Sequence, residues 1–186
     1  DPVHKVTIIP RGRALGITMQ LPEEDRYSHN REYLLARIAV LMGGRIAEQH
    51  YSGDISSGAA GDIQQATKMA KSMVTQFGMS DKLGMVQYGG SNEYVFLGRD
   101  MAQSKDYSED TAQLIDDEVK RIIGECYQCA EALIKKNRNK LKIIAEALLE
   151  YESLDGTQVE EIVKTGKFNK PGKNMKSGGP TGAKAA

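Results

Sequence analysis

The chain has 186 residues, with 25 basic and 25 acidic side chains and a mean hydropathy of −0.47. This length and composition are typical of a globular protein with one substantial hydrophobic core. No apolar run approaches the ~20 residues that a membrane-spanning helix requires. The sequence opens with Asp1-Pro2 and shows neither an initiator methionine nor a basic and apolar leader, so we expect a chain cut from a longer protein.

The neutral net charge is the sum of two unequal parts. Residues 166–186 contain five lysines and no acid, which leaves 20 basic and 25 acidic side chains in residues 1–165. The five glycines and two prolines of residues 166–186 predict a disordered basic tail. Because phosphate binding needs a concentrated positive surface, the acidic body argues against nucleic acid as a partner. The tail alone leaves open a contact with RNA or anionic lipid.

Residues 5–21 carry an extended pattern. Two short strands are predicted: Val6–Ile9, which is largely β-branched, and Leu15–Leu21, which alternates apolar with other residues. The turn-like residues 10–13 separate them. Such alternation favours one buried and one exposed face, and a small sheet with a free edge can pair with another extended chain.

Apolar residues at three- and four-residue spacing predict a first helix that begins after Ser28 or Asn30, either of which can cap it, and ends near Gln49. Gly43 and Gly44 lie inside this helix, where each costs about 1 kcal/mol, so we expect another backbone packed very close to them. The apolar positions are Leu34, Leu35, Ile38, Leu41, Met42 and Ile46.

A Ser- and Gly-rich loop over residues 52–61 precedes a second predicted helix, which opens at Asp62 and stops at Gly78. Its expected buried stripe consists of Ile63, Ala66, Thr67, Ala70, Met73, Val74 and Phe77. Residues 78–107 predict a long surface loop with a short strand near residues 94–97. Its expected anchors on the core are Tyr88, Tyr94 and Phe96.

Three more helices are predicted in the second half of the chain. The longest runs from a Ser108 cap to about Lys136, a break at residues 137–139 precedes the fourth, and Thr157 with Glu160 forms a capping box for a short fifth. Their apolar positions are Ile115, Val119, Ile122, Cys126, Ala130 and Leu133, then Leu141, Ile144, Ala145, Leu148 and Leu149, then Val159, Ile162 and Val163. The predicted fold class is therefore mainly α with a small N-terminal sheet.

Cys126 and Cys129 form a C-x-x-C inside the third predicted helix. A redox pair of this spacing belongs at a helix N-terminus, where the thiol pKa falls, and a zinc knuckle needs a second pair of ligands nearby. The sequence therefore favours two reduced thiols on or near a core face. The absence of a disulfide framework fits a reducing compartment.

Two acidic residues each allow a structural and a functional interpretation. Asp62 is either a helix cap paired with Gln65 or a carboxylate held at a helix start, where it suits a metal ion. Glu48 is either a solvated surface acid or, if a catalytic helix packs on the glycine pair, a support for its side chains. No Ser/His/Asp or Cys/His combination and no phosphate-binding P-loop is recognisable.

Several motifs follow one another along the first hundred residues. They are residues 1–12 (DPVHKVTIIPRG), 14–16 (ALG), 21–22 (LP), 43–48 (GGRIAE), 57–59 (SGA), 62–63 (DI), 73–74 (MV), 77–80 (FGMS) and 96–99 (FLGR). In this order they closely resemble the peptidase domain of the FtsH family, the membrane-bound, ATP-dependent zinc metalloproteases. The similarity covers roughly residues 1–165.

The resemblance implies a helical zinc-peptidase domain with a small sheet. In the full protein it would be joined to a membrane anchor and to an AAA ATPase domain that uses ATP and Mg²⁺, and it would assemble as a homo-hexamer that acts on polypeptides. Asp62 matches the family's aspartate ligand of Zn²⁺, and Glu48 matches an acid that supports the two ligand histidines. The strand that lines the substrate cleft matches Ala14, Leu15, Gly16, Ile17, Thr18, Met19 and Gln20.

The sequence departs from the family pattern because it contains no H-E-x-x-H, which we expect upstream of Asp1. A catalytic zinc needs three protein ligands and one open position, so we expect this chain alone to bind zinc weakly and to cleave nothing.

The leading hypothesis is a C-terminal fragment of a membrane-anchored, ATP-dependent zinc endopeptidase that degrades unfolded and membrane proteins. Its peptidase domain would lie in the cytoplasm or an equivalent reducing compartment. The alternative is a protease-dead hexameric scaffold or a chaperone-like peptide-binding domain.

Overall fold

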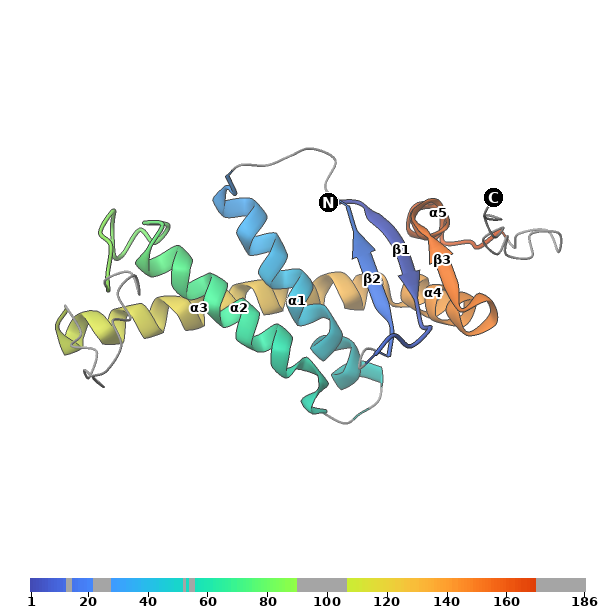
Figure 1. The fold of residues 1–186 in the computed structure, drawn as a ribbon, viewed down its shortest axis with the longest axis horizontal. Helices are drawn as coiled ribbons and strands as arrows, with labels where there is room; N and C mark the ends of the chain where they lie inside the picture. Colours follow the sequence, from blue (N-terminus) through green and yellow to red (C-terminus); the bar gives the residue numbers. More distant parts are fainter. Residues whose placement is uncertain (13–14, 22–27, 52, 54–55, 90–106, 170–186) are drawn as a thin grey trace, which may run out of the picture. The chain divides into compact units, whose positions relative to one another are not determined.

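The computed structural model describes residues 1–12, 15–21, 28–51, 53, 56–89 and 107–169 (Figure 1). Helices dominate these residues and a small antiparallel sheet accompanies them, which confirms the mainly α fold class. The chain divides into two compact units, residues 26–136 and residues 1–25 with 137–186. Each unit has its own core, and the two are described in turn.

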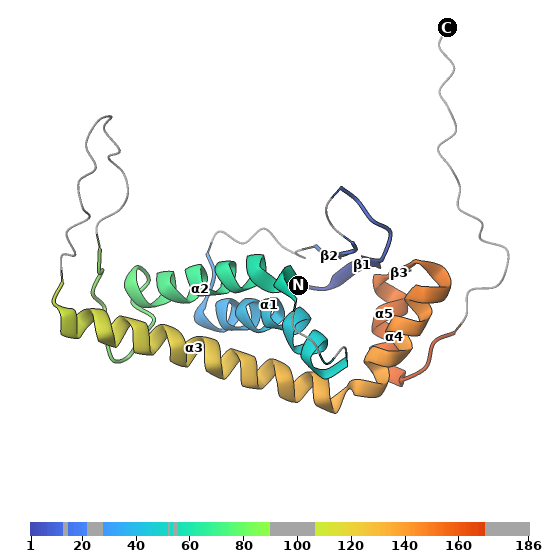
Figure 2. The same cartoon turned by 90° about the horizontal axis from the view of Figure 1, so that it is seen from below.

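Three long helices form the unit of residues 26–136: α1 (Arg31–Tyr51), α2 (Ala60–Thr75) and α3 (Glu109–Lys136). A short 3₁₀ helix, η1 (Ser57–Ala59), leads directly into α2. Each long helix packs against the other two (Figure 2), because each carries one apolar stripe at helical spacing. The shared core contains Leu34, Ile38, Met42, Ile46, Ala66, Ala70, Met73, Val74, Leu83, Ile115, Ile122, Cys126 and Ala130.

Two of these helices begin at side-chain caps that the sequence predicts. The Asn30 carboxamide oxygen accepts a hydrogen bond from the Tyr33 amide at 2.8 Å, which selects Asn30 rather than Ser28 as the cap of α1. The Ser108 hydroxyl accepts one from the Thr111 amide at 3.2 Å and caps α3 as expected. Each cap satisfies an amide that the helix itself leaves without a partner.

The expectation of a close backbone at Gly43 and Gly44 is wrong for the part of the chain that the structure describes. A Cβ added at either glycine would meet nothing within 4 Å. Met42 and Ile46 carry the buried face of α1, and the next two positions after Met42 point about 100° and 200° away from it. Gly44 is therefore exposed and Gly43 half-buried, with room for a Cβ at both positions.

The buried stripe of α2 is narrower than the sequence predicts. Phe77 is 53% exposed and lies beyond the helix, because α2 ends at Thr75 and not at the predicted Gly78. Within the helix Ile63 is 46% exposed and Thr67 is also exposed, whereas the small residues Ala66 and Ala70 are fully buried. Two alanines let the neighbouring helices approach closely, and this close contact leaves the flanking positions outside. The same holds at the end of α3, where Leu133 is 56% exposed.

The residues that follow α2 return to its core. Tyr88 is half-buried, donates its hydroxyl proton to the Leu83 carbonyl at 3.1 Å, and donates its amide to the Thr75 carbonyl at 2.9 Å. This confirms the predicted anchoring role of Tyr88. The other predicted anchors, Tyr94 and Phe96, and the predicted strand at residues 94–97 lie outside the described residues.

A three-stranded antiparallel sheet organises the other unit. Its strands are β1 (Val3–Thr7), β2 (Ile17–Gln20) and β3 (Ser153–Asp155), in the order β2-β1-β3, with Val6 opposite both Thr18 and Leu154. The sequence misses β3 because three residues are too few to show a period. The prediction of strand at Ile8 and Ile9 is wrong, since β1 ends at Thr7 and both isoleucines are exposed.

Two helices pack beside this sheet, α4 (Arg138–Tyr151) and α5 (Gly156–Thr165). Their core is Ala147, Leu148, Leu154, Val159 and Ile162, with Val6, Ile143, Ile144 and Phe168 packed against it. The predicted burial of Leu148 is confirmed, whereas that of Ala145 and Leu149 is wrong, because α4 turns Ala147 toward the core beside Leu148.

The capping box of α5 lies two positions before the predicted one. The Asp155 carboxylate accepts a hydrogen bond from the Gln158 amide at 2.9 Å, and the Gln158 side chain accepts one from the Asp155 amide at 3.0 Å. Thr157 donates its hydroxyl to Asp155, so the predicted Thr157 and Glu160 pair is wrong. At the other end, Gly166 (φ +69°) closes α5.

None of the helices in the described segments combines the length and the apolarity needed to cross a membrane.

Candidate functional site

Asp62 lies in the first turn of α2 and does not cap it. The helix begins at Ala60 with Ala59 at the cap position, so the interpretation of Asp62 and Gln65 as a capping box is wrong. The capping side chain belongs to Ser56, which precedes η1. Because η1 supplies the first turn, α2 starts two residues before Asp62, and Asp62 is left available for another role.

The Asp62 side chain is half-buried at the N-terminal end of α2. Among the residues that the structure describes, its carboxylate makes no hydrogen bond and no ion pair. Asp62 therefore presents a carboxylate oxygen donor from the first turn of a helix.

Glu48 lies near the end of α1 and contacts the segment that leads to Asp62. Its Oε1 accepts a hydrogen bond from the Ser56 hydroxyl at 2.7 Å, and its Oε2 lies 4.0 Å from Nη1 of Arg45, one helical turn earlier. The interpretation of Glu48 as a simple solvated surface acid is therefore wrong. The acid links α1 to the segment that begins α2.

Asp62 fits a metal ion as a single ligand only. Zinc sites in enzymes use three protein ligands. Within the described segments no group of three His, Cys, Asp or Glu side chains could hold a metal ion. These described residues by themselves do not make a zinc site.

The strand β2 forms one edge of its sheet, with β1 on its other side, in the described part of the chain. Of the predicted edge residues, Ile17, Thr18, Met19 and Gln20 form β2, Leu15 and Gly16 precede it, and Ala14 lies outside the described residues. Gly16 is required by space, since a Cβ there would lie 2.7 Å from the Thr7 carbonyl oxygen. Leu15 and Met19 are exposed, which leaves apolar side chains beside the edge.

These predicted site residues fall in both units. Glu48 and Asp62 belong to residues 26–136, and β2 belongs to the other unit. Within residues 26–136 the contact between Glu48 and Ser56 brings the end of α1 to the start of η1.

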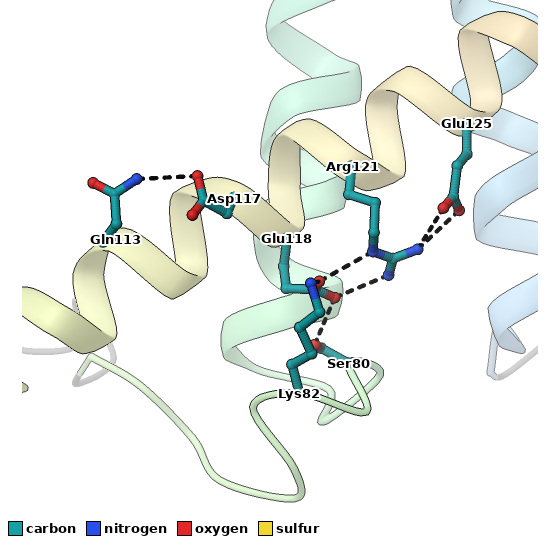
Figure 3. A network of polar contacts seen from close by, with 7 residues as sticks. All are labelled: Ser80, Lys82, Gln113, Asp117, Glu118, Arg121 and Glu125. Carbon is teal, nitrogen blue, oxygen red and sulfur yellow. Dashed lines mark hydrogen bonds and ion pairs between the residues drawn. The ribbon is translucent and has the colours of Figure 1, made fainter.

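Sequence reasoning missed a buried acid on α3. Glu118 is 1% exposed and accepts hydrogen bonds from Ser80 (2.9 Å) and from Nε and Nη2 of Arg121 (3.0 and 2.9 Å), and it pairs with Lys82 at 2.9 Å (Figure 3). Arg121 lowers the pKa of Glu118 to about 2, with help from Lys82 and Ser80 and against the effect of burial. The missed signal was an acid placed between Ile115 and Ile122 on the apolar stripe.

The two cysteines differ in environment. Cys126 is buried and its Sγ donates to the Leu35 carbonyl at 3.4 Å, and burial raises its thiol pKa, whereas Cys129 is exposed. A buried thiol with a raised pKa is a weak nucleophile. The predicted place on a core face is therefore confirmed for Cys126 and is wrong for Cys129.

The comparisons with known proteins agree on one family. The model of peptidase family M41 matches residues 1–162. An ATP-dependent zinc metalloprotease FtsH 2 of Methylacidiphilum infernorum is 54% identical over 175 residues, which are 94% of this chain and 27% of that protein. An ATP-dependent zinc metalloprotease FtsH of Nitrosococcus oceani is 52% identical over 164 residues, 88% of this chain and 26% of that protein. The chain thus spans about a quarter of the length of these relatives.

Proposed function

Because the chain belongs to peptidase family M41, we propose that it is the C-terminal part of the peptidase domain of an ATP-dependent zinc endopeptidase that degrades unfolded and membrane proteins. The observation that carries this proposal is the continuous family match over residues 1–162, which includes Glu48, Asp62 and β2.

In the proposed enzyme Asp62 supplies one oxygen ligand to zinc. Its place in the first turn of α2 and the lack of a competing partner among the described residues support this role. The two histidine ligands and the catalytic glutamate come from an H-E-x-x-H segment outside this chain. Glu48 acts indirectly, by holding the groups around the ligands in place.

The proposed substrate is an extended polypeptide that pairs with β2. An added strand is held mainly by backbone hydrogen bonds, which every sequence offers, so this mode of binding suits an enzyme that degrades many unfolded chains. The edge position of β2 supports the proposal, and the exposed Leu15 and Met19 provide apolar contacts for substrate side chains.

The remaining parts of the proposal concern the whole protein. An AAA domain with ATP and Mg²⁺ feeds substrate to the peptidase site, segments outside this chain anchor the protein in a membrane, and the protein assembles as a homo-hexamer. The peptidase domain lies in the cytoplasm or an equivalent reducing compartment, in keeping with two free cysteines. Nucleic acid is not among the proposed partners.

The substitution Asp62→Asn in the full-length protein tests the proposed ligand. We expect less bound zinc by elemental analysis and slower casein degradation, with an unchanged ATPase rate, because an amide is a much weaker zinc ligand than a carboxylate. Asp116→Asn is the control, since Asp116 is exposed on α3. Wild-type zinc content and casein degradation in Asp62→Asn would remove Asp62 from the site.

An assay of the isolated 186-residue chain tests whether the zinc site needs ligands from outside it. We expect no casein cleavage from it, because the described residues do not complete a zinc site. Cleavage that a chelator abolishes would contradict this part of the proposal.

The alternative function is a protease-dead hexameric scaffold or a chaperone-like peptide-binding domain. The place of β2 at the edge of the sheet, among the strands that the structure describes, favours it as well, since strand pairing needs no catalytic group. The two functions differ in outcome: the scaffold retains labelled casein intact when ATP is present, whereas the endopeptidase releases short peptides. An intact H-E-x-x-H in the coding sequence upstream of Asp1 favours the endopeptidase.

A further inference from the structure

We propose that Ser56 is a positioning residue for Asp62. Its hydroxyl ties η1 to Glu48 and thereby sets where α2 begins and where the Asp62 carboxylate is presented. This inference rests on the proposed role of Asp62 and adds a residue to which neither the sequence motifs nor the family match assigns a role.

The hydroxyl of Ser56 uses both of its hydrogen-bonding functions. It donates its single proton to Oε1 of Glu48 at 2.7 Å and accepts the Gly58 amide at 3.1 Å. The first bond reaches back to the end of α1, and the second caps η1. One side chain therefore joins a packed helix to the turn that starts the next one.

Glu48, the acceptor of the Ser56 hydroxyl, projects from a helix that is packed in the core. This helix is α1, whose Ile46 is fully buried in the core of the unit. Arg45 lies 4.0 Å from its Oε2 on the same helix, which favours a carboxylate orientation that leaves Oε1 for Ser56. The acceptor is charged, and a hydrogen bond to a charged group is stronger than a neutral one.

Gly58 shows how closely the three groups approach. A Cβ at this position would lie 3.1 Å from Oγ of Ser56 and 3.7 Å from Oε1 of Glu48. The shorter distance is tighter than ordinary van der Waals contact, so a Cβ here would displace the hydroxyl by a few tenths of an ångström. The glycine thus leaves the space that the hydrogen bonds need.

No loop separates this link from Asp62. The helix η1 ends at Ala59 and α2 begins at Ala60, and the Ala60 amide donates to the Ser57 carbonyl. Ala59 is buried, which fixes the junction. A displacement of η1 should therefore also displace the first turn of α2, because no flexible residue separates the two helices.

The experiment compares Ser56→Ala, Ser56→Thr and Ser57→Ala in the full-length protein. Threonine keeps the hydroxyl and suits the extended backbone of Ser56 (φ −97°, ψ 165°), and Ser57 is an exposed neighbour for which the structure describes no side-chain hydrogen bond. Deuterium uptake of peptides over residues 56–66 reports the order of the turn. Zinc content after dialysis reports the ligand.

We expect Ser56→Ala to speed the uptake about 5-fold, as for other lost caps, and to weaken zinc retention about 10-fold, as for other residues that orient ligands. Ser56→Thr and Ser57→Ala should stay within about 2-fold of wild type in both measurements. Wild-type uptake in Ser56→Ala, or equal losses in Ser56→Ala and Ser56→Thr, would overturn the proposal.

A second variant covers the case in which Ser56→Ala does not fold. Gly58→Ala keeps the hydroxyl but crowds it, and it should also speed uptake over residues 56–66. Wild-type uptake and zinc retention in Gly58→Ala would overturn the proposal.

The two proposals fail in different ways. If Asp62→Asn retains zinc while Ser56→Ala speeds uptake, the ligand assignment is wrong and Ser56 still orders the turn. If Asp62→Asn loses zinc and Ser56→Ala leaves uptake unchanged, the positioning role is wrong and the ligand assignment stands.

Discussion

The hydroxyl of Ser80 donates a hydrogen bond to Oε2 of Glu118 at 2.9 Å, across 38 positions of sequence. Both side chains are almost completely buried, at 2% and 1% exposure. A buried carboxylate lowers stability unless it is paired and fully hydrogen-bonded, and Lys82 and Arg121 complete its partners (Figure 3). The residues after α2 are therefore tied to α3 by a charged network as well as by apolar contacts.

The substitution Glu118→Gln should lower the free energy of unfolding of the chain by about 3 kcal/mol. The amide cannot accept from all three partners, and it leaves two cations facing a buried polar group. Guanidinium denaturation followed by circular dichroism measures the change. Glu125→Gln is the matched control, because Glu125 pairs with the same Arg121 but is 59% exposed, and it should cost less than about 1 kcal/mol.

Stability should fall in acid through Glu118. Its pKa is lowered from 4.5 to about 2 in the folded chain, so the carboxylate contributes its full stabilisation above pH 4.5 and loses it as the pH falls to about 2. At about 1.4 kcal/mol per pH unit, the contribution is on the order of 3 kcal/mol. Denaturation at several pH values measures the slope. Glu118→Gln should have a shallower slope between pH 2 and 4.5, and a slope equal to wild type would contradict this origin.

The position of the capping box can be tested by two substitutions at the start of α5. Asp155→Ala removes the cap that accepts the Gln158 amide and should cost about 1 kcal/mol. Glu160→Ala removes only an exposed ion pair with Lys164 and should cost less than about 0.5 kcal/mol. Thermal unfolding compares the two. A larger loss in Glu160→Ala would favour the capping box that the sequence predicts.

Two glycine substitutions should change stability in opposite directions. Gly44→Ala adds a methyl group to an open face of α1 and should stabilise the chain by about 0.5–1 kcal/mol through helix propensity. Gly156→Ala places a Cβ only 2.1 Å from the Val3 carbonyl oxygen and should destabilise the chain by displacing β1 from α5. Midpoints of thermal unfolding give both signs. Destabilisation by Gly44→Ala would indicate a neighbour packed against α1.

Local signals explain the parts of the fold that were predicted correctly. Residues such as Ile38, Met73 and Ile122 recur at helical spacing, and Asn30 and Ser108 begin helices with the side chains that cap them best. The strand β3 was missed because its backbone pairs with β1, nearly 150 residues away, and three residues carry no period of their own. Ile63 was misplaced because the width of a buried stripe depends on the neighbouring helix, and Phe77 because α2 ends before it, at Thr75.

The residues of the candidate site likewise fall into those that the sequence identified and one that it did not. Asp62 and Glu48 were selected from the sequence by resemblance, but the role of Ser56 was not. Its hydroxyl acts only because α1 and η1 meet in space, at a separation of eight positions that corresponds to no regular element.

The sequence by itself determined the helices, the caps at Asn30 and Ser108 and the family, because these depend on the order and spacing of side chains along a short stretch of chain. Only the tertiary structure decided which acids are partnered: Glu118 is paired with Ser80, Lys82 and Arg121, and Glu48 is held by Ser56. The physical reason is that the ionisation and orientation of a carboxylate are set by groups within hydrogen-bond distance, and folding brings those groups from distant positions in the chain.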